Sequence, residues 1–219
     1  MKIVKKLGFT LIELIIVVSI IAILMSIIIP ASQKVFAEAR KSKARAAMKQ
    51  IAETYCRYYQ NNGFIPYADS SLELAERFAE EGELNNANLF VFPGDSQAAA
   101  VMRENIWPID EEGEYKHAWE PDKKLSVVLV GNITKEVNQS TTPIAYSRGL
   151  DKENGTWSKD GVWGTDGGFI GFLDGQVRWF KTIDNKLSTE NGETSSIEAI
   201  LGEDGVGGRI LDNVDTYYW

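Results

Sequence analysis

The stretch that decides the fold runs from Lys5 to Glu13 and reads Lys-Lys-Leu-Gly-Phe-Thr-Leu-Ile-Glu. Residues 14–29 follow without a single charge, and Pro30 ends the run. The 21 residues from Phe9 to Ile29 make a helix of roughly 30 Å, which is the thickness of a bilayer core. The pattern predicts a membrane-spanning helix with one carboxylate near its start, and a carboxylate in that position indicates a function.

The leader, residues 1–8, is basic and ends in a small residue, but it does not fit an ordinary secretory signal peptide. Such signals are cut at a small-residue site after the apolar region, whereas Gly8 precedes it. No Ala-x-Ala-like site follows Ile29, and the only cysteine, Cys56, is too distant for a lipoprotein signal. Cleavage after Gly8 leaves the apolar segment as the N-terminus of the mature chain.

At these residues the chain resembles the superfamily of type IV pilins and type II secretion pseudopilins, whose signature is a basic leader, a glycine and Phe-Thr-Leu-Ile-Glu. The resemblance implies cleavage between Gly8 and Phe9 by a prepilin peptidase, followed by N-methylation of Phe9. It implies a structural subunit rather than an enzyme, which joins other subunits in a helical filament with the help of a membrane platform protein and an assembly ATPase. It also implies a single-pass protein of the bacterial inner membrane, with a cytoplasmic N-terminus and an extracytoplasmic head, which moves into a periplasmic pseudopilus or a surface filament.

Two interpretations apply to Glu13. A charge among apolar helices is tolerated only when it is paired, so Glu13 is expected to pair with the Phe9 amine of a neighbouring subunit and to fix the register of assembly. Alternatively, Glu13 lies one turn into the helix and simply reaches the headgroup region. The Gly8-Phe9 pair directly upstream favours the assembly role.

Charge is unevenly distributed along the chain. The net charge is −8, and without the three leader lysines 20 basic residues face 31 acidic ones, so nucleic acid is not an expected partner. A basic stretch follows the membrane segment. The positive-inside rule alone would place this stretch in the cytoplasm. The cleavage motif implies the opposite topology, with the leader in the cytoplasm, and we prefer the topology that the motif implies. The stretch is interpreted as a flank beside anionic lipid headgroups, or alternatively as a collar that meets acidic surfaces of adjacent subunits. Its members are Lys34, Arg40, Lys41, Lys43, Arg45 and Lys49.

Helical character continues beyond Pro30, which is expected to kink or locally melt the helix. Met48, Ile51, Tyr55 and Tyr58 form one apolar stripe, which is expected to pack on a globular head. Asn and Gly residues predict that the helix stops near position 62. The expected organisation is a leader at 1–8, a transmembrane part at 9–29, an extracytoplasmic stem at 30–62 and a head at 63–219.

The head is predicted to be α+β, with a small antiparallel sheet against the long N-terminal helix. A short helix is expected over Ser71–Glu81, and apolar runs predict strands at Leu125–Val130 and Pro143–Ser147. Residues 82–123 are hard to interpret, with a candidate strand at Leu89–Phe92. The clearest signal is a hairpin of 169–173 and 176–180 around Asp-Gly, a turn expected to need positive φ at both positions.

Two further resemblances concern the head. Gly63-Phe64-Ile65-Pro66-Tyr67 is similar to the phrase that begins the head of major pseudopilins, and together with the lack of a C-terminal cysteine pair it favours a pseudopilus over a pilus. Residues 167–177 resemble a C-terminal motif of a bacterial prepilin-type subgroup. Phe169 and Gln176 stand where that subgroup commonly has histidines, so no metal or catalytic role is carried over.

Few residues are suited to catalysis. The chain has one histidine, His117, and one cysteine, Cys56, which is expected to be a packing residue on a helix. A calcium site is a weaker prediction, because acidic residues crowd a loop before the hairpin and major pseudopilins have a calcium-binding C-terminal loop; solvated turn formation is the commoner explanation. The loop residues are Asp151, Glu153, Asn154, Asp160 and Asp166, with Asp160 and Asp166 as the named candidates. No other cofactor is expected.

The alternative function is a membrane-anchored, extracytoplasmic ligand-binding module. Trp157, Trp163, Trp179 and Trp219 would line its binding surface, and exposure of several on one face would favour it. A single-pass membrane enzyme is a third option, but no set of residues in the sequence supports it.

Overall fold

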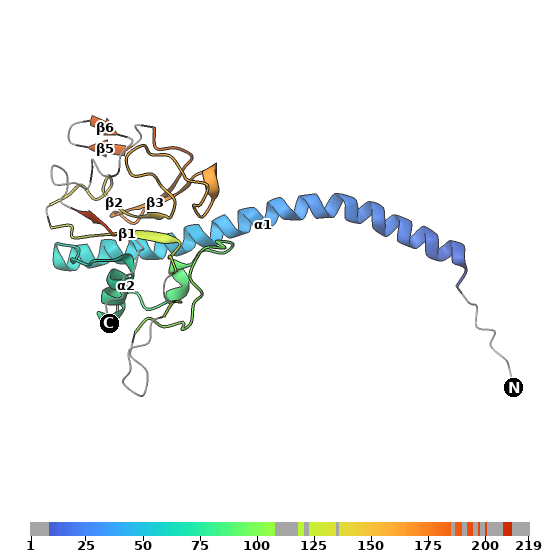
Figure 1. Cartoon of the computed structure of the whole chain (residues 1–219), viewed down its shortest axis with the longest axis horizontal. Coiled ribbons are helices and arrows are strands. Elements are labelled where there is room, and N and C mark those ends of the chain that lie inside the picture. The colour runs from blue at the N-terminus through green and yellow to red at the C-terminus, as the bar shows by residue number, and fades with distance from the viewer. Residues whose placement is uncertain are drawn as a thin grey trace. The chain divides into compact units, whose positions relative to one another are not determined.

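The computed structural model describes residues 9–107, 118–120, 123–134, 136–184, 187–189, 192–194, 197, 200 and 208–211. Helix α1 spans Leu11–Asn62 and continues through Pro30 without a break (Figure 1). Its end at Asn62 confirms the predicted stop. The chain forms two compact units, divided between Lys41 and Ser42, so the outer part of α1 belongs to the same unit as the head.

In the first unit, α1 is an isolated apolar helix. The large apolar side chains between Phe9 and Ile29 are all exposed, and this is the one described helix that is long and apolar enough to cross a membrane. The hydroxyl groups of its serines form hydrogen bonds within the helix. Ser19 Oγ donates to the Ile15 carbonyl and Ser26 Oγ to the Ile23 carbonyl, both at 2.7 Å. Polar groups satisfied within the helix are what a hydrocarbon environment requires.

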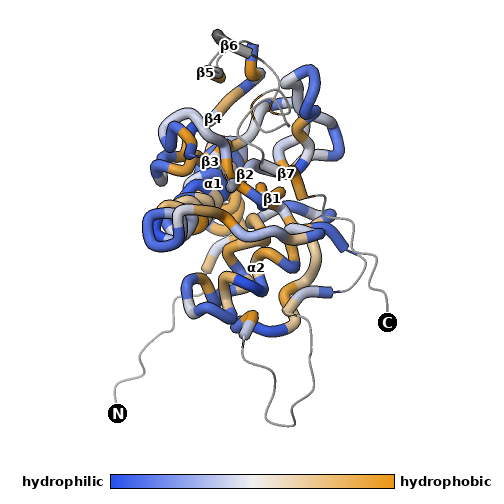
Figure 2. The backbone as a smooth tube through the Cα atoms, turned by 90° about the vertical axis from the view of Figure 1, so that its left-hand side faces the viewer, coloured by the Kyte–Doolittle hydropathy of each residue, from blue (hydrophilic) through white to orange (hydrophobic). Residues whose placement is uncertain are grey.

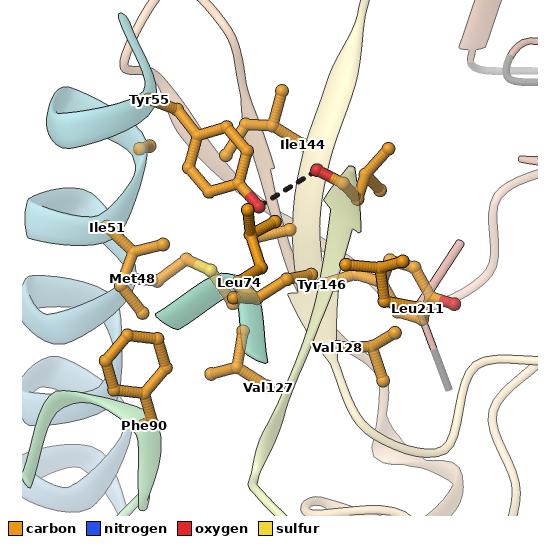
Figure 3. Packing of buried hydrophobic residues seen from close by; sticks show 14 of the residues in the cluster. Met48, Ile51, Tyr55, Leu74, Phe90, Val127, Val128, Ile144, Tyr146 and Leu211 are labelled. Atoms are coloured by element: carbon orange, nitrogen blue, oxygen red, sulfur yellow. Dashed lines mark hydrogen bonds between the residues drawn. The ribbon is translucent and has the colours of Figure 1, made fainter. Parts of the chain in front are cut away.

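In the second unit, the predicted apolar stripe of α1 lies in the core. Met48, Ile51 and Tyr55 are fully buried and Tyr58 nearly so, which confirms the prediction. The Tyr55 hydroxyl donates to the Val130 carbonyl at 2.9 Å (Figure 3). Burial raises the pKa of Tyr55 well above its usual value, so this phenol stays a hydrogen-bond donor throughout the neutral range.

Helix α2 spans Ser71–Glu80, confirming the predicted short helix. Ser70 caps it, because its side-chain oxygen accepts the Glu73 backbone N–H at 3.1 Å, an orphan donor of the first turn. The inward face is apolar, and Phe78 meets the edge of the Tyr55 ring with centroids 4.9 Å apart. These contacts fasten α2 to α1 within the head.

The main sheet has the strand order β4-β3-β2-β1-β7, and every neighbouring pair is antiparallel. The predicted strands are confirmed by β1 and β2, and the predicted hairpin by β3 and β4. A further antiparallel pair, β5 with β6, lies outside this sheet. In Figure 2 the strand β1 is coloured mainly as hydrophobic, and every residue of β1 and β2 is buried. The bounds are β1 Val127–Gly131, β2 Pro143–Ser147, β3 Gly168–Phe172, β4 Val177–Phe180, β5 Leu187–Thr189, β6 Gly192–Thr194 and β7 Arg209–Ile210.

The turn between β3 and β4 differs from the predicted one. Gly175 has φ 81°, whereas Asp174 is absent from the residues with positive φ in the described part of the chain. The Gly175 N–H donates to the Phe172 carbonyl and the Phe172 N–H to the Gln176 carbonyl, both at 2.9 Å. This is a three-residue loop that closes with a left-handed glycine. The expectation of two positive φ angles was therefore wrong.

The candidate strand at Leu89–Phe92 was also wrong. The structure has a 3-10 helix, η1, at Ala87–Phe90, and a shorter one, η2, at Gly164–Asp166. Asn86 explains η1, since its side-chain oxygen accepts the Asn88 backbone N–H at 2.9 Å and so nucleates a tight turn. A local side-chain cap overrode the strand propensity of the apolar residues that follow.

Strand β3 packs against the loop before it so closely that only glycine fits at position 168. A Cβ built there lies 2.3 Å from two ring carbons of the buried Trp157. We expect Gly168→Ala to destabilise the head by about 1–3 kcal/mol through overpacking, measured by urea unfolding in detergent. Gly171→Ala in the same strand is the control, because its nearest contacts are 3.5 Å away; equal losses in both variants would contradict this packing.

Candidate functional site

The candidate site is the start of α1, where Thr10 and Glu13 form a closed hydrogen-bond pair. Glu13 Oε2 accepts the Thr10 backbone N–H at 2.8 Å and the Thr10 hydroxyl at 2.6 Å. In return the Glu13 N–H approaches Thr10 Oγ1 at 3.3 Å. Helix α1 begins one residue after Thr10. The two residues are thus a capping box, in which orphan donors of the first turn are satisfied reciprocally.

Sequence reasoning missed this local role. The signal was present, because Thr-x-x-Glu before an apolar run is the sequence signature of a capping box. Glu13 is also suited to this place electrostatically, since a negative carboxylate near a helix N-terminus interacts favourably with the positive end of the macrodipole. An intermolecular partner is therefore not needed to explain why a carboxylate occurs here.

The cap leaves one carboxylate oxygen available. Both bonds from Thr10 go to Oε2, and Oε1 has no hydrogen-bond partner in the described part of the chain. Glu13 and Phe9 are both exposed, Phe9 at 76%. A cation can reach Oε1 without disturbing the cap, because an ionised carboxylate offers about four acceptor positions. Gly8, the other residue of the predicted cleavage site, lies outside the described residues.

Comparison with known proteins finds the same segment. Residues 4–29 match the family model described as the prokaryotic N-terminal methylation motif. Over 76 residues the chain is 36% identical to the type IV major pilin protein PilE of Neisseria gonorrhoeae.

The N-terminal segment of the chain is thus similar to that of the type IV pilin and pseudopilin superfamily.

The similarity to PilE covers 35% of this chain and 46% of that pilin, so the chain spans about half the length of this relative. No solved structure matches the chain significantly. The long helix against an antiparallel sheet agrees with the α+β pilin fold that the sequence predicted. The methylation motif and the apolar helix together support membrane anchoring for this chain.

The structure does not gather the calcium candidates into a ligand set. In the described ranges no three His, Cys, Asp or Glu residues come together as a metal would need. Asp160 instead offers its backbone carbonyl to Arg148 Nη1 at 2.6 Å, and Asp166 lies in η2. Asp151 acts as a turn former: it accepts the Glu153 and Asn154 backbone N–H groups and the Asn154 amide, and these bonds lower its pKa. Calcium binding by this pilin-like chain stays an untested prediction.

The tryptophans are packed rather than displayed together. Trp157 is 6% exposed. Trp163 and Trp179 are half-buried, with ring centroids 6.1 Å apart, and both contact Phe169. No observation on these residues favours the ligand-binding alternative. Trp219 lies outside the described residues.

Of the two residues with reactive side chains, the structure describes Cys56. Cys56 is half-buried on α1, where burial and then the nearby Asp174 and Glu53 charges raise its pKa. A raised pKa leaves little thiolate at neutral pH, as expected for a packing residue. His117 lies outside the described residues.

A buried polar network in the head was also missed. Arg148 Nη2 donates to Asp95 Oδ1 at 2.6 Å and to Oδ2 at 2.8 Å, and both side chains are nearly buried. Ser126 Oγ donates to Asp95 Oδ2 at 2.8 Å and accepts the Phe92 backbone N–H at 2.9 Å. Arg148 also lines an open cavity of about 350 Å³ with Lys124 and Lys152. The network ties the segment after η1 to the ends of β1 and β2.

Proposed function

We propose that this chain is a structural subunit of a helical filament and not an enzyme. The observation that carries the proposal is the methylation motif on an exposed apolar helix, because such a helix needs either lipid or other copies to cover it. A repeating contact between copies that does not close on itself generates a filament. The similarity to a major pilin supports the same function.

Processing before assembly is part of the proposal. A prepilin peptidase cleaves between Gly8 and Phe9, and Phe9 is N-methylated. The mature subunit waits in the inner membrane with its head outside the cytoplasm, and a platform protein with an assembly ATPase then moves it into the filament. In that filament the free Oε1 of Glu13 receives the Phe9 ammonium of a neighbouring copy, while Oε2 keeps its bonds to Thr10.

Of the two filament types, we propose a type II secretion pseudopilus. The support is the Gly63–Tyr67 phrase, which the structure ties to the segment after β1. The Ile65 N–H donates to the Ile133 carbonyl at 2.8 Å, and the Asn132 N–H donates to the Pro66 carbonyl at 2.9 Å. Loss of secretion with normal surface piliation, after deletion in the native cell, is expected; the reverse phenotype would assign the chain to a pilus instead.

The test of processing is the N-terminal mass of the protein isolated from its native membrane. We expect a chain that starts at methylated Phe9. In a strain that lacks the prepilin peptidase, the same protein is expected to keep Met1 and to stay in the membrane fraction. An intact leader in cells with an active peptidase would contradict the proposal and would favour a membrane-anchored binding module.

A further inference from the structure

Two basic residues on the outer part of α1, Lys43 and Arg45, have no ion-pair partner among the described residues. Both are exposed. Lys49 pairs with Glu53 at 3.5 Å, with both side chains more than half exposed. Exposed pairs of this kind contribute little to stability. The cations therefore do not serve the fold of the head.

Charge separates sharply along the chain at this point. Residues 9–49 carry six basic and two acidic side chains, whereas residues 50–219 carry 14 basic and 29 acidic ones. In the proposed filament many copies of the acidic head are present for each basic segment to contact. A second copy of this chain is then the most available anionic partner, because each copy in the filament supplies one basic segment and one acidic head.

One acidic place on the head includes a carboxylate, that of Glu80, which the contacts of the head do not explain. We define the acidic tip as Glu80, Glu81 and Glu83, at and just beyond the C-terminal end of α2. Carboxylates there face the negative end of the helix macrodipole, where basic residues are preferred. Glu83 pairs with Arg57 at 2.5 Å and Glu81 accepts the Tyr58 hydroxyl at 3.2 Å. Glu80 is exposed and has no partner among the described residues. A residue that breaks a local stability rule points to a role outside the monomer.

We propose that the acidic tip of one copy docks on Lys43 and Arg45 of a second copy. The inference rests on the proposed filament function and names the contact that orients the heads. Lipid is the weaker partner, because Arg45 comes 16 residues after Ile29, roughly 24 Å of helix. The headgroup layer is only about 5–8 Å deep on each side.

Charge reversal in the full-length, processed protein tests this contact. Filament yield is measured by electron microscopy and by the amount of subunit in the sheared fraction. Arg45→Glu and Glu80→Arg are each expected to lower the yield roughly fivefold or more, as expected for about 1 kcal/mol lost at each repeat. The double variant Arg45→Glu/Glu80→Arg recreates the pair with exchanged signs and is expected to restore assembly. Lys181→Glu, at an exposed position on the head, is the matched control and is expected to assemble normally.

Stability separates this role from a structural one. Glu80→Arg is expected to keep or slightly raise the resistance of the head to urea, because it places a cation at the C-terminal end of α2, while the filament yield falls. Wild-type filaments are also expected to dissociate more readily at 1 M salt, where charges are screened beyond about 3 Å.

The outcomes distinguish the two proposals. If the wild type forms no filaments under any condition, the proposed function fails. If the wild type assembles and Arg45→Glu assembles equally well, only the docking contact fails. If both single variants are impaired and the double variant is not restored, the contact is also overturned; reduced binding of Arg45→Glu to phosphatidylglycerol vesicles would then assign these cations to the membrane.

Discussion

Replacement of Glu13 by alanine is expected to leave the protein in the membrane and to lower its incorporation into filaments by more than tenfold. The apolar run from Leu14 to Ile29 is untouched, so insertion does not depend on the carboxylate. In the proposed filament, the alanine leaves a Phe9 ammonium unpaired among apolar helices. An unpaired buried charge costs roughly 3–5 kcal/mol, which is far more than a single surface contact contributes.

Glutamine at the same position separates the two roles of Glu13. Gln is as acceptable as Glu in a capping box, because its carbonyl oxygen can accept the Thr10 donors. It carries no charge, however, and cannot neutralise an ammonium. We therefore expect Glu13→Gln to fail in assembly almost as badly as Glu13→Ala, although its helix start is intact.

Thr10→Ala is the complementary control. It removes the hydroxyl that donates to Glu13 Oε2 at 2.6 Å but keeps the carboxylate and the backbone bond. Loss of a cap costs about 0.5–2 kcal/mol of helix stability, and the charge remains available for a neighbouring copy. Membrane and sheared-filament fractions are compared by immunoblot for all three variants. Normal incorporation of Glu13→Gln, together with failure of Thr10→Ala, would show that Glu13 acts only as a cap.

Sequence reasoning succeeded where the pattern is local and periodic. Spacings of three and four placed Met48, Ile51 and Tyr55 on the buried face of α1, because burial of one helix face requires that period. The β3–β4 hairpin was found from its apolar runs and its Asp-Gly pair. Even there the turn geometry was wrong, since a three-residue loop needs a left-handed conformation only at Gly175.

Sequence reasoning failed where competing local hydrogen bonds or contacts between distant residues determine the structure. At Leu89–Phe92 a side-chain cap from Asn86 replaced the expected strand. At Glu13 the charge drew attention to a partner subunit, while the Thr10 cap three residues away went unnoticed. The pairing of Asp95 with Arg148 joins positions 53 residues apart, and no periodicity relates them. In the sequence, Asp95 and Arg148 each look like an ordinary charged surface residue.

That buried pair gives the largest expected loss of stability in the head. Asp95 and Arg148 have side chains 3% and 10% exposed, so neither charge is well hydrated. Asp95→Ala leaves the Arg148 guanidinium buried without its counter-ion and removes the acceptor of the Ser126 hydroxyl. We expect a loss of about 3–5 kcal/mol in the free energy of unfolding, measured by urea denaturation of the full chain in detergent.

A second substitution tests whether the loss of stability comes from the unpaired charge of Arg148 or from the absence of the ion pair itself. In Asp95→Ala/Arg148→Met the cation is gone and an apolar side chain of similar length fills its space. A buried pair replaced by packed apolar groups often costs little, although here the Gln97 side chain and the Asp160 carbonyl also lose a donor. The double variant is therefore expected to be more stable than Asp95→Ala alone. If it is instead less stable, Arg148 stabilises the head mainly through Gln97 and Asp160, and the ion pair with Asp95 is secondary.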